Sequence, residues 1–312
     1  MVASTHTAAG SNLFNPEDTK EVFSRVAGFS SLATVAKQMP IPFAGTDVFV
    51  FSATDEAGIV GEGASKPVQA GTASKVAIKP VKVVIQYRVT DEFMNISQEK
   101  QIPYLDAFYD AMAKKIARAL DIMAMHGIDP KTKTASTLIG ANKLDDSTVT
   151  TGIAEIPQTT KPDEDLESAI NALLENDRNC TGIIMSPAFA ADLGKLKDKS
   201  DSNVRLYKEF AFGGRPTSFA GQDVSINNTV SYNASTTTNA MNPVAYVGDF
   251  ADAFRWGYSD DIQTEIIEFG NPDGQGDLKA TNEIVLRAEA YIGWGILDKG
   301  SFRRIAKKVT AS

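Results

Sequence analysis

The spacing of apolar positions predicts one long helix in the first half of the chain. Between about residues 103 and 126, apolar side chains recur every three or four positions, as they do on the buried face of a helix. This stripe consists of Leu105, Phe108, Met112, Ile116, Leu120 and Met123. Gly127 follows at the position where such a helix would end. At about 1.5 Å per residue the helix would be about 36 Å long, enough to form the backbone of an extended domain.

Alternating apolar and polar positions predict a long β-hairpin before this helix. Residues 48–51 are a short apolar run, residues 57–71 are rich in glycine, and residues 75–90 alternate as a strand requires. The outgoing arm is acidic, and the returning arm is basic. The charged residues are Asp55, Glu56 and Glu62 on the first arm and Lys75, Lys79 and Lys82 on the second. Such a division of charge can guide pairing between neighbouring copies, and an ordinary solvated hairpin explains it equally well.

The rest of the chain predicts an α/β region followed by further strands. Residues 163–175 place apolar side chains on one helical face, residues 182–185 are a short buried strand, and Ser186 and Pro187 begin another helix. Every even position from 284 to 296 is apolar, which predicts a long strand with one buried face. At the other end of the chain, residues 1–15 are small and polar, and residues 16–26 predict a short helix.

Composition and charge restrict the functional class. The chain has 312 residues, is 43% hydrophobic and carries a formal charge of −8. No run approaches the roughly 20 apolar residues of a membrane helix, and the first residues do not resemble an export signal. Cys180 is the only cysteine, so no disulfide forms within the chain. The acidic balance argues against a protein that grips nucleic acid, whereas a container that encloses DNA needs no such grip.

Residues with catalytic or metal-binding chemistry are few. The two histidines are His6, near the chain start, and His126, at the end of the predicted helix, where it would interact with the helix dipole. The glycine-rich residues 58–66 lack the Gly-Lys-Ser/Thr ending of a phosphate loop. Residues 271–282 partly resemble a calcium loop, but Asn282 stands where that loop has glutamate. We therefore expect no enzyme activity, no cofactor and no metal.

The order of these elements resembles one known family over nearly the whole chain. Its motifs are residues 62–67 (Glu-Gly-Ala-Ser-Lys-Pro), 182–187 (Gly-Ile-Ile-Met-Ser-Pro), 247–250 (Val-Gly-Asp-Phe) and 284–294. Each is short, but their joint order is similar to that of the major capsid proteins of tailed bacteriophages. The resemblance implies the Hong Kong 97-type capsid fold, a mixed α+β and α/β architecture.

The resemblance also implies a domain organisation. It predicts an N-terminal arm at residues 1–35 and a first peripheral part at 36–127, with an extended loop at 45–80 and a spine helix at 103–126. An axial domain follows at 128–255, and a second peripheral part at 256–312. Relatives often have a long N-terminal scaffolding segment, whereas Met1 here stands close to the arm, so a separate scaffolding protein is expected.

The implied function is structural. The chain would self-assemble as pentamers and hexamers into an icosahedral capsid that encloses double-stranded DNA without binding it specifically. Assembly would take place in the bacterial host cytoplasm, with a scaffolding protein and a portal as partners and no membrane. Two alternatives remain: the shell of an encapsulin-type bacterial nanocompartment, and an α/β enzyme that forms a small oligomer.

Some members of this family join a loop lysine to an asparagine of another subunit, with a glutamate as the base. Lys66, Asn282 and Glu289 stand at the matching positions of this sequence. In that chemistry the lysine amine attacks the carboxamide, ammonia leaves, and the carboxylate takes a proton. The alternative is that Lys66 pairs ionically with a neighbour, Asn282 ends a turn, and Glu289 pairs with Arg287 or another cation.

Overall fold

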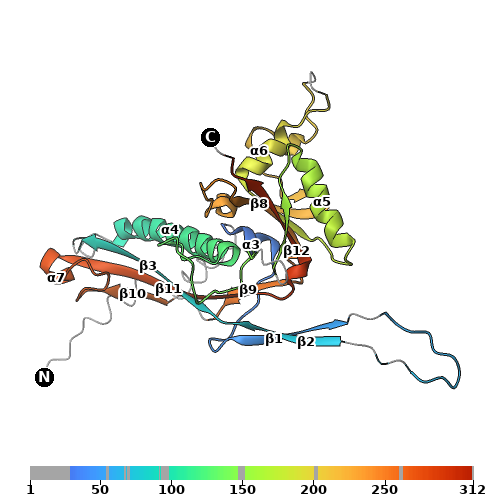
Figure 1. Cartoon of the computed structure of the whole chain (residues 1–312). Coiled ribbons are helices and arrows are strands. Elements are labelled where there is room, and N and C mark those ends of the chain that lie inside the picture. The colour runs from blue at the N-terminus through green and yellow to red at the C-terminus, as the bar shows by residue number, and fades with distance from the viewer. Residues whose placement is uncertain are drawn as a thin grey trace.

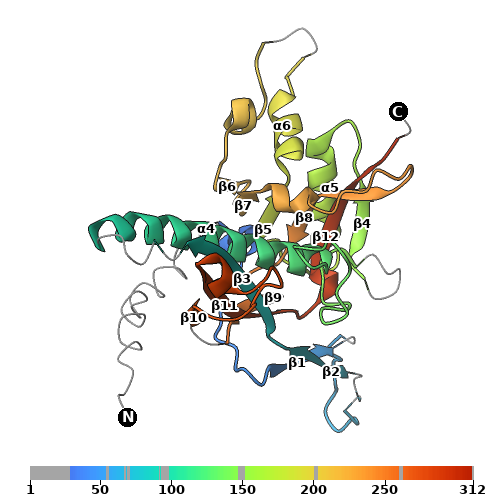
Figure 2. The ribbon, with the colours of Figure 1, turned by 90° about the vertical axis from the view of Figure 1, so that its left-hand side faces the viewer.

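The computed structural model describes residues 29–53, 56–66, 68, 71–90, 92, 98–146, 152–199, 203–259 and 263–310. The helix predicted at residues 16–26 lies outside these ranges. The described part consists of a long helix on a four-stranded sheet, a six-stranded sheet with its own helices, and a two-stranded hairpin that points away from both (Figure 1 and Figure 2). Within the described residues, no helix is long and apolar enough to cross a membrane.

The predicted long helix is present as α4 (Gln98–His126). From Phe108 onward its apolar stripe is buried as expected, with Met112 and Leu120 fully inaccessible to solvent. Gly127 ends the helix with a φ of +68°, a left-handed conformation that costs glycine little. The helix begins five residues earlier than the periodicity predicts. In front of α4 in the sequence, the short helix α3 (Ser31–Val35) is capped by Ser30, whose side chain accepts a hydrogen bond from the Ala33 amide.

The four-stranded sheet is built around the predicted C-terminal strand, β11 (Glu283–Ile296). On one side it pairs with β3 (Val81–Thr90), and it also pairs with β10 (Gln263–Ile267) and β9 (Phe254–Tyr258), all antiparallel. Its even-numbered side chains are buried as predicted, and α4 lies along this sheet (Figure 1). Ile284, Leu286 and Ile292 belong to the same apolar core as the α4 stripe.

The six-stranded sheet confirms the predicted α/β region. Its order is β4 (Ala154–Pro157), β12 (Phe302–Lys308), β8 (Met241–Gly248), β5 (Gly182–Met185), β7 (Gln222–Ile226) and β6 (Ser218–Phe219). Helices α5 (Pro162–Leu174) and α6 (Pro187–Lys195) share a second core with it, and Ser186 caps α6 as its sequence position predicts. The 3-10 helices are η2 (Lys208–Gly213), η3 (Asn228–Ser231) and η4 (Lys299–Ser301), and α7 (Leu278–Thr281) precedes β11.

The last strand returns to the six-stranded sheet. β12 pairs antiparallel with β8 and parallel with β4, and Phe302 and Ile305 are fully buried there. The family resemblance places residues 256–312 in the peripheral part, whereas residues 302–308 belong to the same sheet as β5 and β8. The chain therefore crosses from one sheet to the other between β11 and β12.

The predicted returning arm of the hairpin is two strands rather than one. β1 (Thr46–Ala53) pairs in register with β2 (Gly71–Ile78), while β3 belongs to the four-stranded sheet. The break falls at Lys79 and Pro80. Proline has no amide hydrogen to continue a ladder, so the chain changes partner at this point.

Candidate assembly and cross-linking site

The hairpin of β1 and β2 exposes aromatic side chains to solvent. Phe49 and Phe51, two residues apart on β1, are 78% and 71% exposed. Among the hairpin residues whose burial is described, only Ile78 is buried. An isolated two-stranded hairpin is marginally stable at best, and exposed apolar patches mark interaction surfaces. The hairpin therefore has the character of a surface that a second chain covers.

Ile78 packs the base of the hairpin against the body of the protein. Ile78 is 2% exposed and packs over the glycines of β11. A Cβ atom on Gly295 would lie 2.6 Å from Ile78 Cγ1, and one on Gly293 would lie 3.4 Å from Ile78 Cγ2. Because Gly293 and Gly295 have no side chains, Ile78 can pack directly against this part of β11. The direction of the hairpin is thus set by close packing against the central strand.

The charges of the hairpin are partly internal to the chain. Lys75 Nζ lies 2.6 Å from Asp47 Oδ2, so these two residues link the two strands. Lys82, predicted on the returning arm, belongs to β3 and pairs with Glu289 of β11 at 2.6 Å. Asp55 lies outside the described residues, and Glu56 and Glu62 are exposed on the outgoing loop. The predicted separation of charge between the arms is therefore smaller than the sequence indicates.

The three predicted cross-linking residues do not meet within one chain. Lys66 is exposed in the loop between β1 and β2. Asn282 is exposed and left-handed, with φ 54°, at the end of α7. Glu289 lies seven residues further along, which is about 23 Å along a strand. A reaction among the three would need residues from more than one copy.

Glu289 already has a cationic partner. Its carboxylate accepts from Lys82, and this contact raises the pKa of the Lys82 amine. Arg287, the partner named in the alternative, instead donates to Gln86 Oε1 at 3.1 Å. Within the single chain, Glu289 therefore forms an ion pair, as the alternative interpretation predicts, and its cation is Lys82.

The residues that resembled a calcium loop are held by Arg88. Arg88 donates to both carboxylate oxygens of Asp273 at 2.6 Å, to Glu283 at 2.7 Å and to the Gly276 carbonyl at 2.8 Å. The Arg88 hydrogen bonds lower the pKa of Asp273 to about 2. Asp277 accepts from the Lys279 amide and so caps α7. These carboxylates therefore fix the turn that leads into Asn282.

A buried polar cluster that the sequence did not predict joins α4 to the six-stranded sheet. His126 Nδ1 lies 2.5 Å from Asp145, and its Nε2 lies 2.8 Å from the Thr229 carbonyl. Each ring nitrogen thus faces an oxygen of a neighbouring residue. Burial alone would raise the pKa of Asp145, but His126, Tyr246 and Arg304 outweigh it and lower that pKa. His126 lies in the last turn of α4, as predicted, and it also makes these two specific contacts.

A second buried carboxylate, Asp121 of α4, holds the start of α3. It accepts from the Ser30 hydroxyl, from the Ser31 amide at 2.9 Å, from the Leu32 amide at 3.2 Å and from the Thr229 hydroxyl at 3.0 Å. Burial raises its pKa despite these four donors. Asp121 therefore ties three separate segments together at one point.

Comparison with known proteins identifies the family. A model of the phage capsid family matches residues 10–306, nearly the entire chain. The chain belongs to the phage capsid family. This capsid protein is thus a structural component of phage virions, and the match gives no support to the nanocompartment or enzyme alternatives.

The relatives agree with this assignment in sequence and in fold. The capsid protein is 21% identical over 313 residues to the "Probable major capsid protein gp17" of Mycobacterium phage L5, covering 97% of this chain and 92% of that one. A solved structure from Mycobacterium phage Ogopogo matches with a TM-score of 0.76 and 29% identity, over 89% of this chain and 92% of that one. A solved structure from Gordonia phage Cozz matches with a TM-score of 0.70 and 26% identity, over 91% of this chain and 87% of that one. The predicted Hong Kong 97-type fold is confirmed.

Proposed function

We propose that this capsid protein self-assembles, as pentamers and hexamers, into a closed icosahedral shell around double-stranded phage DNA. The observation that supports this most directly is the two-stranded hairpin, with exposed Phe49 and Phe51, on a fixed base. A neighbouring copy supplies the surface that covers it. A chain of similar fold, with a TM-score of 0.63 and 16% identity, comes from a structure described as the capsid of an empty GTA particle computed with C5 symmetry.

The domain organisation belongs to the same proposal. Residues 1–35 form the arm, and residues 36–127 and 256–301 form the peripheral part, with the hairpin as the extended loop and α4 as the spine. Residues 128–255 form the axial domain. Because β12 pairs with β8, we assign residues 302–308 to the axial sheet rather than to the peripheral part.

The role is mechanical rather than catalytic. A scaffolding protein and a portal are the partners that the family resemblance implies, with assembly in the host cytoplasm before the DNA is enclosed. The enclosed DNA is held by the closed wall and not by recognition of its sequence.

Deletion of the hairpin loop tests the assembly proposal. A chain that lacks residues 57–71 keeps both sheets and α4, so we expect it to fold and remain as small oligomers. Electron microscopy would show closed particles for the intact chain and none for the deletion. Circular dichroism of both chains verifies folding. Normal particles from the deletion variant would contradict the proposed role of the hairpin.

Covalent joining of Lys66 to Asn282 is a second proposal, favoured by the exposure of both side chains. The Lys66 amine would attack the Asn282 carboxamide carbon, forming an amide bond and releasing ammonia, while Glu289 accepts the proton. Denaturing electrophoresis of particles would show a ladder resistant to boiling. Lys66→Arg keeps the charge but removes the nucleophile, so the ladder should disappear while particles persist. A ladder that survives in Lys66→Arg, or no ladder in the intact chain, would refute the reaction.

A further inference from the structure

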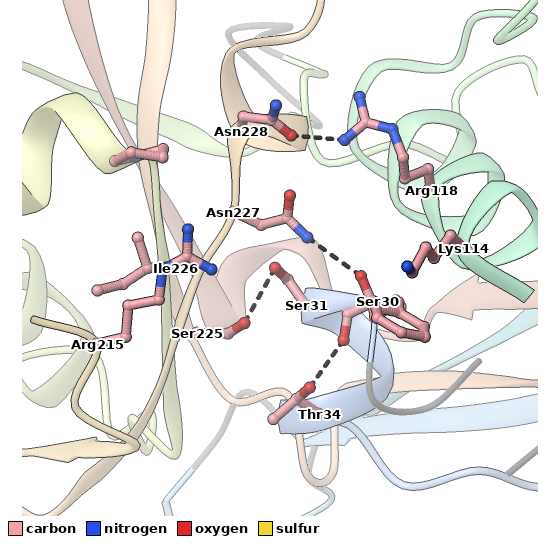
Figure 3. Close-up of a pocket in the computed structure, with 12 residues that line it drawn as sticks. Ser30, Ser31, Thr34, Lys114, Arg118, Arg215, Ser225, Ile226, Asn227 and Asn228 are labelled. Atoms are coloured by element: carbon pink, nitrogen blue, oxygen red, sulfur yellow. Dashed lines mark hydrogen bonds between the residues drawn. The ribbon is translucent and has the colours of Figure 1, made fainter. Parts of the chain in front are cut away.

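A basic cavity of about 430 Å³ opens beside the start of α3 (Figure 3). Its walls come from residues 29–34 around the start of α3, from α4, from residues 225–228 where β7 leads into η3, and from Pro187 and Arg215. Ligand pockets in proteins commonly enclose about 300–1,000 Å³, so the cavity is large enough for part of a nucleotide.

Three cations meet in this cavity. Lys114 and Arg118 reach it from α4, and Arg215 reaches it from the opposite wall (Figure 3). None of the residues that line the cavity is an aspartate or a glutamate. Within the described part of the chain, none of the three cations forms an ion pair. In a chain with a formal charge of −8, this concentration of unbalanced positive charge is a local exception.

The contacts that the cations do make leave their charge available. Arg118 donates to Asn228 Oδ1 at 2.6 Å, which orients the guanidinium without neutralising it. Lys114 Nζ lies 5.2 Å from the centre of the Phe29 ring. A cation–π contact at an exposed site is weak and does not neutralise the charge. An anion that enters the cavity therefore meets positive charge on two walls.

Neutral polar groups complete the lining. The Ser225 hydroxyl donates to the Ser31 hydroxyl at 3.0 Å, and Asn227 Nδ2 donates to the Phe29 carbonyl at 3.3 Å (Figure 3). Hydroxyl and amide groups can turn toward an incoming oxygen. A phosphate group presents several acceptor oxygens in different directions, which matches donors on opposite walls, and the planar guanidinium fork suits it. A single carboxylate offers two oxygens in one plane and would satisfy one wall at a time.

We propose that this cavity binds a phosphate group through Lys114, Arg118 and Arg215. In the assembled capsid that phosphate belongs to the backbone of the enclosed nucleic acid, a step that rests on the proposed function. The contact involves no base, so binding does not depend on the nucleotide sequence. It fastens individual phosphates at one point of a chain whose net charge is negative.

Binding to DNA and to inorganic phosphate tests the proposal on the full chain. The pocket variant combines Lys114→Gln, Arg118→Gln and Arg215→Gln. The control variant combines Lys37→Gln, Lys131→Gln and Lys308→Gln, three exposed lysines outside the cavity, and it loses the same total charge. Fluorescence anisotropy with a short labelled DNA duplex at low salt measures the dissociation constant. Thermal unfolding verifies that both variants fold. If the triple variant does not fold, Arg215→Gln alone replaces it in the assay, because Arg215 is exposed and lies outside α4.

We expect the pocket variant to bind the duplex at least about 10-fold more weakly, and the control less than about 2-fold. The slope of log K against log salt should fall by about 1 in the pocket variant, since each neutralised phosphate contributes about 0.9. Equal weakening in both variants would overturn the site. Orthophosphate that binds the intact chain but not the pocket variant, with no duplex binding by either, would keep the phosphate class but refute nucleic acid as its source. Displacement of the duplex by polyglutamate but not by orthophosphate would show that the site prefers carboxylates, and it would refute the proposal.

Shell formation is scored separately by electron microscopy of the same samples. Particles without phosphate binding would refute this inference and leave the capsid function intact. Phosphate binding without particles would support the phosphate site and contradict the proposed self-assembly.

Discussion

Replacing the two exposed aromatics of the hairpin, Phe49→Ser with Phe51→Ser, should abolish assembly without unfolding the chain. A phenylalanine buries about 150–250 Å² when it is fully covered. With 78% and 71% of each still exposed, roughly 110–190 Å² per ring remains for a neighbour to cover. At about 25 cal/mol per Å², each ring would contribute about 3–5 kcal/mol to a contact that covers it completely. The same exposure means that the isolated chain loses little of its own stability.

Light scattering and sedimentation of the purified double variant measure the assembly loss, and thermal unfolding measures stability. Leu174→Ser, at the exposed end of α5, is the matched control, because it removes an exposed apolar side chain outside the hairpin. We expect the control to assemble as the intact chain does, and the double variant to sediment as a small oligomer with an unchanged midpoint of unfolding. Full assembly of the double variant would refute the argument that these rings are covered by a neighbour. A large fall in its unfolding midpoint would show that the rings stabilise the chain itself.

Three further predictions concern the body of the protein. Asp121→Ala leaves four buried donors without their acceptor, so the free energy of unfolding should fall by about 3–5 kcal/mol in urea titrations, and Asp121→Asn should cost less. Gly295→Ala brings a Cβ to within 2.6 Å of Ile78, so we expect about 1–3 kcal/mol of destabilisation and faster proteolysis of the hairpin. The pKa of Asp145 is lowered in the fold, so its contribution to stability is present above the unfolded pKa of about 3.9 and is lost as the pH falls through the lower folded pKa. Asp145→Asn should therefore narrow the difference in unfolding free energy between neutral pH and about pH 3, and an unchanged difference would contradict the assignment.

The elements with a long, regular pattern were predictable from the sequence. The stripe of α4 and the alternation of β11 each extend over many residues, because each buries one face against the other. The helix cap at Ser186 followed from a local signal in the same way. The returning arm of the hairpin was predicted as one strand, although Pro80 marks the place where the ladder must break. A local signal was present there, but the alternation on both sides of it concealed the change of partner.

The polar clusters could not be predicted, because they join residues that are distant in the sequence. His126 meets Asp145 and the Thr229 carbonyl, which lies 103 residues away. The cavity similarly brings Arg215 opposite Lys114 and Arg118. Periodicity reports only which face of one element is buried, and it contains no information on which loop arrives at that face. The ion pair of Glu289 with Lys82 depends on the register of β11 against β3, which pattern alone leaves open.

Electron microscopy of the purified intact chain tests the central claim most directly. The account predicts closed shells of uniform size, tens of nanometres across, with the hairpin of each copy lying on its neighbour. Monomers and small oligomers alone, at concentrations and salt conditions that keep the chain folded, would contradict self-assembly by this chain.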